Sequence, residues 1–286
     1  MSYLIAVDSG HGMETAGKRT PPIPEAWYGK KKGESIHEKE FNKPVAEYLI
    51  KALERNGFTT INVSPGEKDM SLTERYTAAN KAKADAYISI HYNANTGVWN
   101  SANGIETIVS QYASAKSKEL ANYAQDELVG SLGRRNRGVK TDIEQSGINI
   151  AVLRHTNMPA ILTESGFMDN LEEAKTMLDP TFQKSSAEAM CKGICKFFGV
   201  VYKGEYKMPA QNITRNSAKE DIKWLQEKLN KALAGYTYIP LAVDGIYSAK
   251  VRIAVLMYWE KRGWNQDGKD TGWTAGAGTR EALSKI

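Results

Sequence analysis

Two of the four histidines in this 286-residue chain follow apolar runs that are typical of buried strands. His11 comes after YLIAVD in the stretch VDSGHG, where a glycine stands on each side of it, and His91 closes the run AYISIH. Neutral imidazole nitrogens are frequent zinc ligands, and flanking glycines let a metal and its substrate approach closely. We therefore predict that His11 and His91 are metal ligands that converge at one edge of a sheet.

A catalytic zinc ion takes three protein ligands and keeps one position for water, so a third donor is needed. Four glutamates in the segment after His11 are candidates, namely Glu25, Glu34, Glu38 and Glu40. Glu38 stands just before an apolar stripe that begins at Phe41, where a short lead-in to a helix can hold a carboxylate over the sheet edge. We predict Glu38 as the third ligand, with Glu34 as the main alternative.

One more carboxylate follows a strand-like run. Glu164 lies in AILTESGF, and Gly166 follows it in place of a bulky side chain. A carboxylate beside a water at the metal can take a proton as the water attacks a carbonyl, and can then pass it to the leaving nitrogen. The pattern predicts Glu164 as the general base of a zinc hydrolase. The alternatives are a strand-end carboxylate without function and an ion pair with Arg154.

The other reactive patterns are weaker. HEKEF at His37 begins like a zinc-protease motif, but Phe41 stands where the second histidine would be required. His155, in LRHTNMP, is more typical of a turn or groove residue than of a ligand. The chain contains neither a G-x-S-x-G motif nor a Gly-rich phosphate or dinucleotide loop, and its lysines at 30–32 form one short run without aromatic repeats. We therefore expect no nucleic-acid partner.

Strand-like and amphipathic segments alternate from residue 1 to about 200, and these elements must position the candidate residues. The runs rich in branched and aromatic residues cover 3–8, 58–64, 86–92, 104–110, 150–155 and 159–165. Helices are predicted at about 41–56, 71–83, 116–132 and 183–198. This alternation implies an α/β fold with a mostly parallel twisted sheet, covered by helices on both faces. Ligands gather at the carboxyl ends of the strands in such sheets.

The segment from 12 to 37 is long for a connection in a compact domain, and such loops are usually functional or disordered. Its prolines stiffen it, and Trp27 and Tyr28 offer flat surfaces. It is interpreted either as a wall of a substrate groove or as a solvated, lysine-rich flap.

The chain is predicted to have two domains joined by a linker. Residues 1–200 form the catalytic domain, and 201–213 lose all periodicity and carry Gly204 and Pro209, as linkers do. Residues 214–286 form a small helical domain, with helices at about 222–233 and 253–259. Its aromatic residues are candidates for stacking on sugar rings or for its core: Trp224, Tyr258, Trp259, Trp264 and Trp273.

Composition limits the class of protein and its partners. Hydrophobic residues at 41% and charged residues at 25% are ordinary for a soluble globular protein, and no apolar run approaches the ~20 residues of a membrane span. The net charge of +5 favours anionic partners, among them a bacterial cell wall. No signal-peptide pattern precedes the first strand, so we expect a protein that stays in the cytoplasm until it is released. Cys191 and Cys195 are predicted to be reduced, buried and not metal ligands.

The four motifs VDSGHG, HEKEFN, SIHYNAN and LTESGFMDN together resemble the zinc-dependent N-acetylmuramoyl-L-alanine amidase family, which includes phage endolysins and bacterial autolysins. The resemblance spans about residues 2–199. It implies cleavage of the amide between N-acetylmuramic acid and the L-alanine of the stem peptide in peptidoglycan. It also implies that His11, Glu38 and His91 bind one Zn²⁺ ion and that Glu164 is the catalytic carboxylate. The long segment before Glu38 departs from the family pattern.

The tail resembles a second family, the helical peptidoglycan-binding repeat, through DGIYSAKVRIAVLMYWEKRGW and the flanking WLQEKLN and GTREAL. The match covers about 214–286. Ser248, Val251 and Trp259 stand where that family favours glycine, threonine and glutamine. The resemblance implies that the tail anchors the enzyme to the wall, and the alternative is an appendage for dimerisation or stability.

We therefore expect a peptidoglycan amidase, most simply a phage endolysin that lyses its host, without membrane insertion and of unknown oligomeric state. A sporulation or germination autolysin is the alternative origin. The alternative activities are a zinc peptidase that cuts stem-peptide crossbridges and a wall-binding regulator without catalysis.

Overall fold

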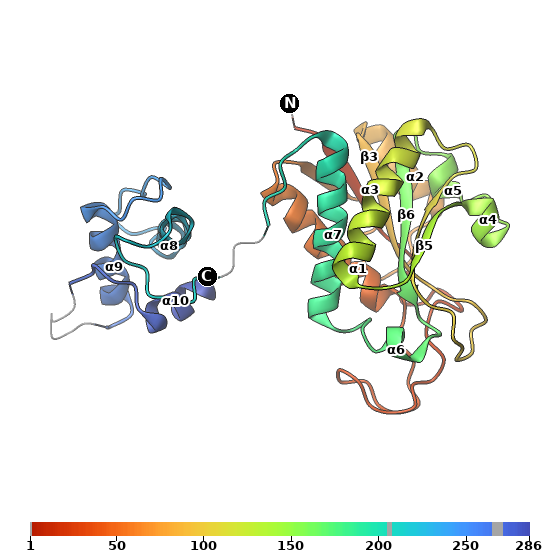
Figure 1. Ribbon diagram of the computed structural model, residues 1–286, viewed down its shortest axis with the longest axis horizontal. Coiled ribbons are helices and arrows are strands. Elements are labelled where there is room, and N and C mark those ends of the chain that lie inside the picture. The colour runs from red at the N-terminus through yellow and green to blue at the C-terminus, as the bar shows by residue number, and fades with distance from the viewer. Residues whose placement is uncertain (1, 205–207, 265–270) are drawn as a thin grey trace. The chain divides into compact units, whose positions relative to one another are not determined.

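The computed structural model describes residues 2–204, 208–264 and 271–286, and these fall into two compact units, Met1–Gly204 and Glu205–Ile286. The first unit is built on a six-stranded sheet with the order β2-β1-β3-β6-β4-β5 (Figure 1). Its strands are β1 (Leu4–Ser9), β2 (Thr59–Asn62), β3 (Ala86–Asn93), β4 (Ile105–Val109), β5 (Asn136–Thr141) and β6 (Ala160–Phe167). Only the β4–β6 pair is antiparallel among these strands. The predicted α/β fold with a mostly parallel sheet is confirmed.

Helices cover both faces of this sheet, as Figure 1 shows. The longest ones, α1 (Lys39–Arg55), α3 (Ala115–Leu132) and α7 (Pro180–Phe198), pack together on one face. The opposite face carries α2 (Leu72–Ala82) and the short α5 (Ala151–Arg154). Two further short helices, α4 (Asp142–Ser146) and α6 (Leu171–Ala174), lie in the connections. The helix α2 begins with the predicted capping box, in which the Ser71 side chain accepts from the Glu74 backbone amide.

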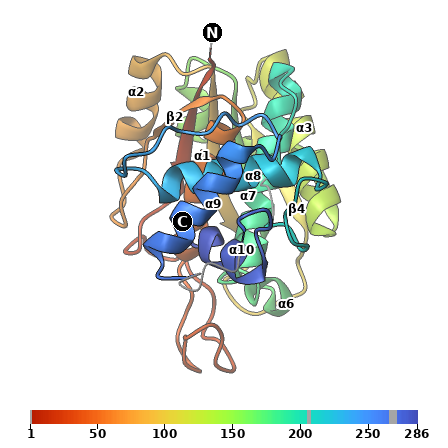
Figure 2. The ribbon, with the colours of Figure 1, turned by 90° about the vertical axis from the view of Figure 1, so that its left-hand side faces the viewer.

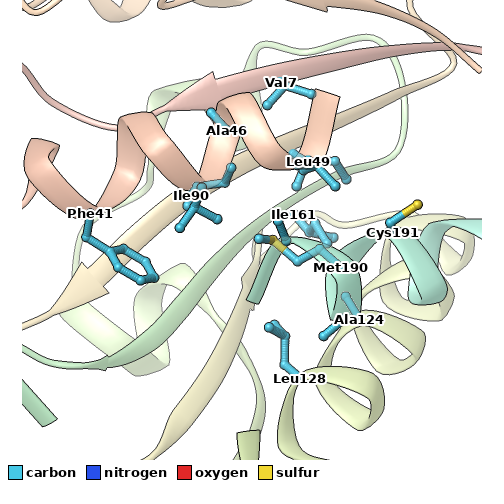
Figure 3. Packing of buried hydrophobic residues seen from close by; sticks show 14 of the residues in the cluster. Val7, Phe41, Ala46, Leu49, Ile90, Ala124, Leu128, Ile161, Met190 and Cys191 are labelled. Carbon is cyan, nitrogen blue, oxygen red and sulfur yellow. The ribbon is translucent and has the colours of Figure 1, made fainter. Parts of the chain in front are cut away.

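The main core lies between the sheet and the three long helices (Figure 3). Val7 on β1, Ile90 on β3 and Ile161 on β6 point toward Leu49 of α1 and Met190 of α7, and all five side chains are fully buried. Burial of each such side chain stabilises the fold by about 1.5–3 kcal/mol. The core therefore holds the three adjacent strands β1, β3 and β6 in place, and their carboxyl ends lie at the same edge of the sheet.

The prediction of a strand at 150–155 is wrong. Ala151–Arg154 is the helix α5, and its apolar side chains Val152 and Leu153 pack into the smaller core on the far face of the sheet. A short apolar run suits a buried helical turn as well as a strand, and periodicity alone cannot separate the two. The edge strand β5 was not predicted, because its sequence NRGVKT is mostly polar and contains a glycine with positive φ.

The long segment 12–37 forms an anchored hairpin that projects from the first unit (Figure 1). The backbone amides of Thr20 and Ile23 donate to the carbonyls of Ile36 and Glu34 at 2.9 and 2.8 Å. Trp27 is buried and meets Trp99 edge-on, whereas Tyr28 is exposed. The hairpin is thus held by its backbone pairing and by Trp27, its lysines at 31 and 32 are exposed as in a solvated flap, and a role as a groove wall stays a prediction.

The second unit contains α8 (Lys219–Ala232), α9 (Ala249–Lys261) and α10 (Ala277–Ser284), which gather around a core of their own (Figure 2). The predicted helices 222–233 and 253–259 correspond to α8 and α9. Three of the five candidate aromatic residues, Trp224, Tyr258 and Trp259, are buried in this core. No helix in the described part of the chain is both long and apolar enough to span a bilayer.

Residues at the two ends of the predicted 201–213 linker belong to the two units. The Tyr202 hydroxyl donates to Glu188, and the Lys203 amide donates to Asn56 in the first unit. Ile213 pairs with Ala275 in the second unit, and Arg280 donates to the Pro209 carbonyl. Residues 205–207 of this segment lie outside the described residues.

Candidate active site

A cavity of about 890 Å³ opens at the carboxyl ends of β1, β3 and β6. All four predicted site residues line it: His11, Glu38, His91 and Glu164. His11 follows β1 directly, and His91 and Glu164 are register partners on β3 and β6. Residues that are up to 153 positions apart in the sequence therefore meet at one edge of the sheet, as the strand pattern predicts.

His11, Glu38 and His91 form a compact group whose potential ligand atoms all lie within 4.8 Å of one another. Glu38 stands between the two imidazoles: its Oε2 lies 3.4 Å from His11 Nε2, and its Oε1 lies 3.0 Å from His91 Nδ1. The two rings are nearly perpendicular, with centroids 4.8 Å apart. Two ligand atoms of a four-coordinate zinc ion with bonds of 2.0–2.1 Å are separated by about 3.3 Å. The two closest pairs, at 3.4 and 3.0 Å, lie near that separation.

The glycines around His11 make this approach possible. A β-carbon on Gly10 would lie 2.2 Å from the His91 ring, so the imidazole of His91 occupies the space that a side chain would need. A β-carbon on Gly12 would lie 2.2 Å from the backbone nitrogen of Asp69. His11 itself adopts φ 58°, a conformation that costs energy for residues other than glycine. The GHG sequence therefore allows one imidazole to lie against the other.

Glu38 is fixed by its place at the start of α1. Its Oε1 accepts hydrogen bonds from the Tyr92 backbone amide and from Asn42 Nδ2, both at 3.1 Å. Its own amide donates to the Lys18 carbonyl at 2.9 Å. The carboxylate is almost completely buried, so its direction is set by the backbone and not by its own flexibility.

The competing glutamates lie outside this group. Glu34 accepts from the Lys31 amide within the hairpin, and Glu25 accepts from the Trp27 indole. Glu40 forms an ion pair with Lys30 at 2.8 Å. Each of the three has a local partner in the hairpin, and none belongs to the cluster of possible metal ligands found in the described residues.

The protonation states suit a cation. Burial lowers the pKa of His11 to about 4, so its imidazole is neutral at pH 7 and can offer a lone pair. Burial alone would raise the pKa of Glu38, but His11 and His91 more than offset this and hold the pKa below its usual range. A buried anion between two imidazoles is the donor set that zinc prefers in hydrolytic sites.

Glu164 faces the same cavity without a partner. Its Oε2 is buried and has no hydrogen-bond partner among the described residues. Burial, followed by repulsion from Glu38, raises the pKa of Glu164 well above its ordinary value. Arg154, the predicted alternative partner, instead donates to His155 Nε2 and to the Asn149 carbonyl. A carboxyl that binds protons more tightly than usual can act as a general base near neutral pH.

The residues that form the two side walls of the cavity could not be predicted from the sequence. One wall is formed by residues 69–72 and Arg75 before and within α2, and the other by 145–152 around α5. Leu72 and Ile148 are exposed apolar residues on these walls. From the hairpin only Lys18 reaches the cavity. The strand predicted at 150–155 concealed the second wall, which the Asp142 carboxylate holds in place by accepting from the Ile150 amide at 2.9 Å, a contact that no local sequence pattern marks.

The two remaining histidines are not in this group. His37 forms an isolated bridge with Arg19 at the base of the hairpin, and His155 is exposed and stacks near Tyr76 with centroids 5.1 Å apart.

Comparison with known proteins places these features in a family. Residues 5–196 match the family model described as N-acetylmuramoyl-L-alanine amidase. N-acetylmuramoyl-L-alanine amidase LytC of Bacillus subtilis (strain 168) is 31% identical over 195 residues, which are 68% of this chain and 35% of that protein. The endolysin of Bacillus phage SPP1 is 27% identical over 223 residues, or 77% of this chain and 74% of that protein. The crystal structure of an N-acetylmuramoyl-L-alanine amidase from Clostridium difficile 630 has 30% identity and a TM-score of 0.59, covering 69% of this chain and 97% of that one.

Proposed function

The chain belongs to the N-acetylmuramoyl-L-alanine amidase family and hydrolyses the amide that joins N-acetylmuramic acid to the stem peptide of peptidoglycan, and we propose that it does so with one Zn²⁺ ion held by His11, Glu38 and His91. The observation that carries this proposal is the position of the Glu38 carboxylate between two imidazole nitrogens at 3.4 and 3.0 Å. When bound, zinc supplies a Lewis acid that polarises a carbonyl and makes water a nucleophile at neutral pH.

Glu164 is the residue that moves the proton in this scheme. Its unpartnered Oε2 accepts a proton from the attacking water, and the same carboxyl then donates that proton to the L-alanine nitrogen as the amide bond breaks. The two products are a muramic acid whose lactyl group ends in a free carboxyl and a stem peptide that begins with the free amine of L-alanine. The raised pKa of Glu164 favours capture of the proton in the first step.

The walls of the cavity orient the substrate. Apolar side chains such as Leu72 and Ile148 can cover the aliphatic parts of the stem peptide, and Lys18 places a positive charge near the reacting centre. The charge of Lys18 opposes the raised pKa of Glu164. It therefore helps to keep this carboxyl ionised before the reaction.

The products of digestion test the bond that is cut. Digests of purified cell wall should gain free L-alanine amino groups, counted by amine labelling, and should gain no reducing sugar ends. New reducing ends would indicate a glycosidase. A zinc peptidase that cuts stem-peptide crossbridges would leave part of the stem on the muramic acid, and mass spectrometry of the released fragments separates it from an amidase.

We also propose that the second unit anchors the enzyme to peptidoglycan. Two aromatic side chains support this role: Trp264 is partly exposed, and Trp273 is flanked by Arg215 and Arg252 at 4.0 and 5.7 Å from its ring centre. Aromatic rings with neighbouring cations suit sugars that carry acidic peptides. A weak anchor raises the local concentration of substrate at the catalytic unit.

Sedimentation with purified walls tests the anchor. The Glu164→Gln chain, which cannot digest its target, should bind walls more tightly than the same variant that ends at Gly204, whose catalytic unit has its own core. Equal binding would contradict the anchor and would favour a role in stability or dimerisation, which light scattering of the two chains measures.

For the biological context, we propose that this protein is a phage endolysin. The similarity to the SPP1 endolysin over 77% of this chain supports it. The alternative is a sporulation or germination autolysin, since a sporulation-specific amidase of Bacillus subtilis is also 27% identical over 198 residues. Both contexts place the action of the enzyme at the bacterial cell wall, after release from the cytoplasm.

A further inference from the structure

A buried chain of hydrogen bonds leads from the core of the first unit to His91. Ser89 lies two residues before His91 on β3, and its Oγ is 3.0 Å from His91 Nε2. The same Oγ donates to Asp8 Oδ2 on β1 at 2.8 Å. Ser89 and Asp8 are both almost completely shielded from solvent. This contact is on the side of the imidazole that faces away from Glu38.

Asp8 lies at the inner end of this chain of hydrogen bonds, and further donors hold its carboxylate in place. Arg75 Nη1 donates to Asp8 Oδ1 at 2.7 Å, and the Tyr87 hydroxyl donates to Oδ2 at 2.9 Å. Arg75 is itself buried and also pairs with Asp69 at 2.6 Å. A carboxylate between a guanidinium and two hydroxyls is an acceptor only.

The position of each hydrogen in this chain of hydrogen bonds follows from its donors and acceptors. Burial, with the nearby negative charge of Asp8, raises the pKa of Tyr87 well above its ordinary value, so Tyr87 keeps its hydrogen and donates it to Asp8. Ser89 has one hydroxyl hydrogen, and the carboxylate 2.8 Å away requires it. The Ser89 oxygen can then only accept from His91. The hydrogen between them therefore belongs to His91 Nε2.

The opposite nitrogen of His91 follows from this count. With the hydrogen on Nε2, a neutral imidazole carries its lone pair on Nδ1. Nδ1 faces Glu38 Oε1 at 3.0 Å, so in this neutral tautomer two acceptors meet. A cation between these two atoms removes the repulsion.

We propose that Ser89, held by Asp8, is a positioning residue that fixes the tautomer of His91 and presents its Nδ1 to the metal. This inference rests on the proposed zinc site. Outer hydrogen bonds of this kind orient a ligating imidazole and raise its basicity, and their loss typically costs 10–100-fold in metal affinity.

Two measurements on the full chain test the role of Ser89. Nitrogen-15 NMR of the metal-free protein should show a hydrogen on His91 Nε2, whether or not Nδ1 also binds a proton beside Glu38, and this spectrum needs no substitution. Competition with a chromophoric chelator should show that Ser89→Ala weakens Zn²⁺ binding about 10–100-fold. Ser186→Ala is the matched control, because Ser186 is equally buried but its hydroxyl donates only to the Phe182 carbonyl in its own helix. We expect this variant to bind Zn²⁺ within twofold of the unsubstituted chain.

The outcomes separate this inference from the proposed function. A His91 hydrogen on Nδ1 alone, or an affinity of Ser89→Ala equal to that of Ser186→Ala, would overturn the role of Ser89 while leaving the zinc site in place. Failure of the unsubstituted chain to bind Zn²⁺ would contradict the zinc site itself, and the spectrum of the same sample still decides the tautomer. If Ser89→Ala does not fold, circular dichroism reveals it, and the spectrum of the unsubstituted chain remains decisive.

Discussion

Replacing Glu164 by alanine lowers the rate of peptidoglycan hydrolysis at least ~100-fold while the bound metal is retained. The loss follows because no other carboxyl with an unpartnered oxygen lines the cavity among the described residues. Metal retention follows because Glu164 is outside the group formed by His11, Glu38 and His91. Wall turbidity measures the rate, and elemental analysis of the purified variant measures the metal. Unchanged lysis would refute the role of Glu164 as base.

The isosteric Glu164→Gln variant supplies a control on folding. The raised pKa of Glu164 means that the folded metal-free protein binds this proton more tightly than the unfolded chain. Its contribution to stability is thus present at low pH and is lost as the pH rises above the ordinary glutamate value. Metal-free Glu164→Gln should therefore melt above the unsubstituted protein at pH 7, with the difference closing near pH 4. Glu172→Gln, at an exposed glutamate, should change neither rate nor melting.

Removal of the metal is expected to abolish hydrolysis completely. A strong chelator should reduce wall lysis to background, and added Zn²⁺ should restore it, because the Lewis acid is then returned to the three proposed ligands. The holoprotein should also unfold at a higher temperature, since a metal at 1,000 times its Kd stabilises the folded state by about 4.1 kcal/mol. Calorimetry with and without chelator measures the difference.

Single substitutions identify the ligands behind this effect. His91→Ala and Glu38→Ala should each lose both the metal and the activity. His155→Ala is the matched control, because this exposed imidazole lies outside the group of possible ligands. Full activity in the presence of excess chelator, or Zn²⁺ binding in Glu38→Ala equal to that of His155→Ala, would refute the proposed site.

The fold and three of the four site residues were accessible from the sequence because they depend on strand ends. His11, His91 and Glu164 each follow an apolar run, and parallel strands bring their carboxyl ends to one edge. Local pattern and global topology agree at these positions, so short-range reasoning was sufficient. The same reasoning failed at Ala151–Arg154, where an apolar run of four residues fits a helical turn against the sheet.

Other features could not be predicted because they depend on contacts between distant residues. Residue pattern alone left Glu34 open as a ligand, since the hairpin that turns its carboxylate toward the Lys31 amide has no local signature. Likewise, the hydrogen bonds that Ser89 and Arg75 donate to Asp8 join three separate elements, β3, α2 and β1. Ser89 looks like an ordinary strand residue until the register of β1 with β3 is known.

The hairpin before Glu38 has a consequence for the evolution of such chains. Its two arms are tied at the base, where the Glu38 amide donates to the Lys18 carbonyl and the Thr20 amide to the Ile36 carbonyl, both at 2.9 Å. Extra residues at the exposed turn of Tyr28 and Gly29 would lengthen the tip beyond the paired Trp27 and Lys30 and leave the base unchanged. The position of Glu38, the proposed third ligand, is thereby insulated from insertions at this turn, so a graft or a peptide tag can be accepted here without cost to the chemistry.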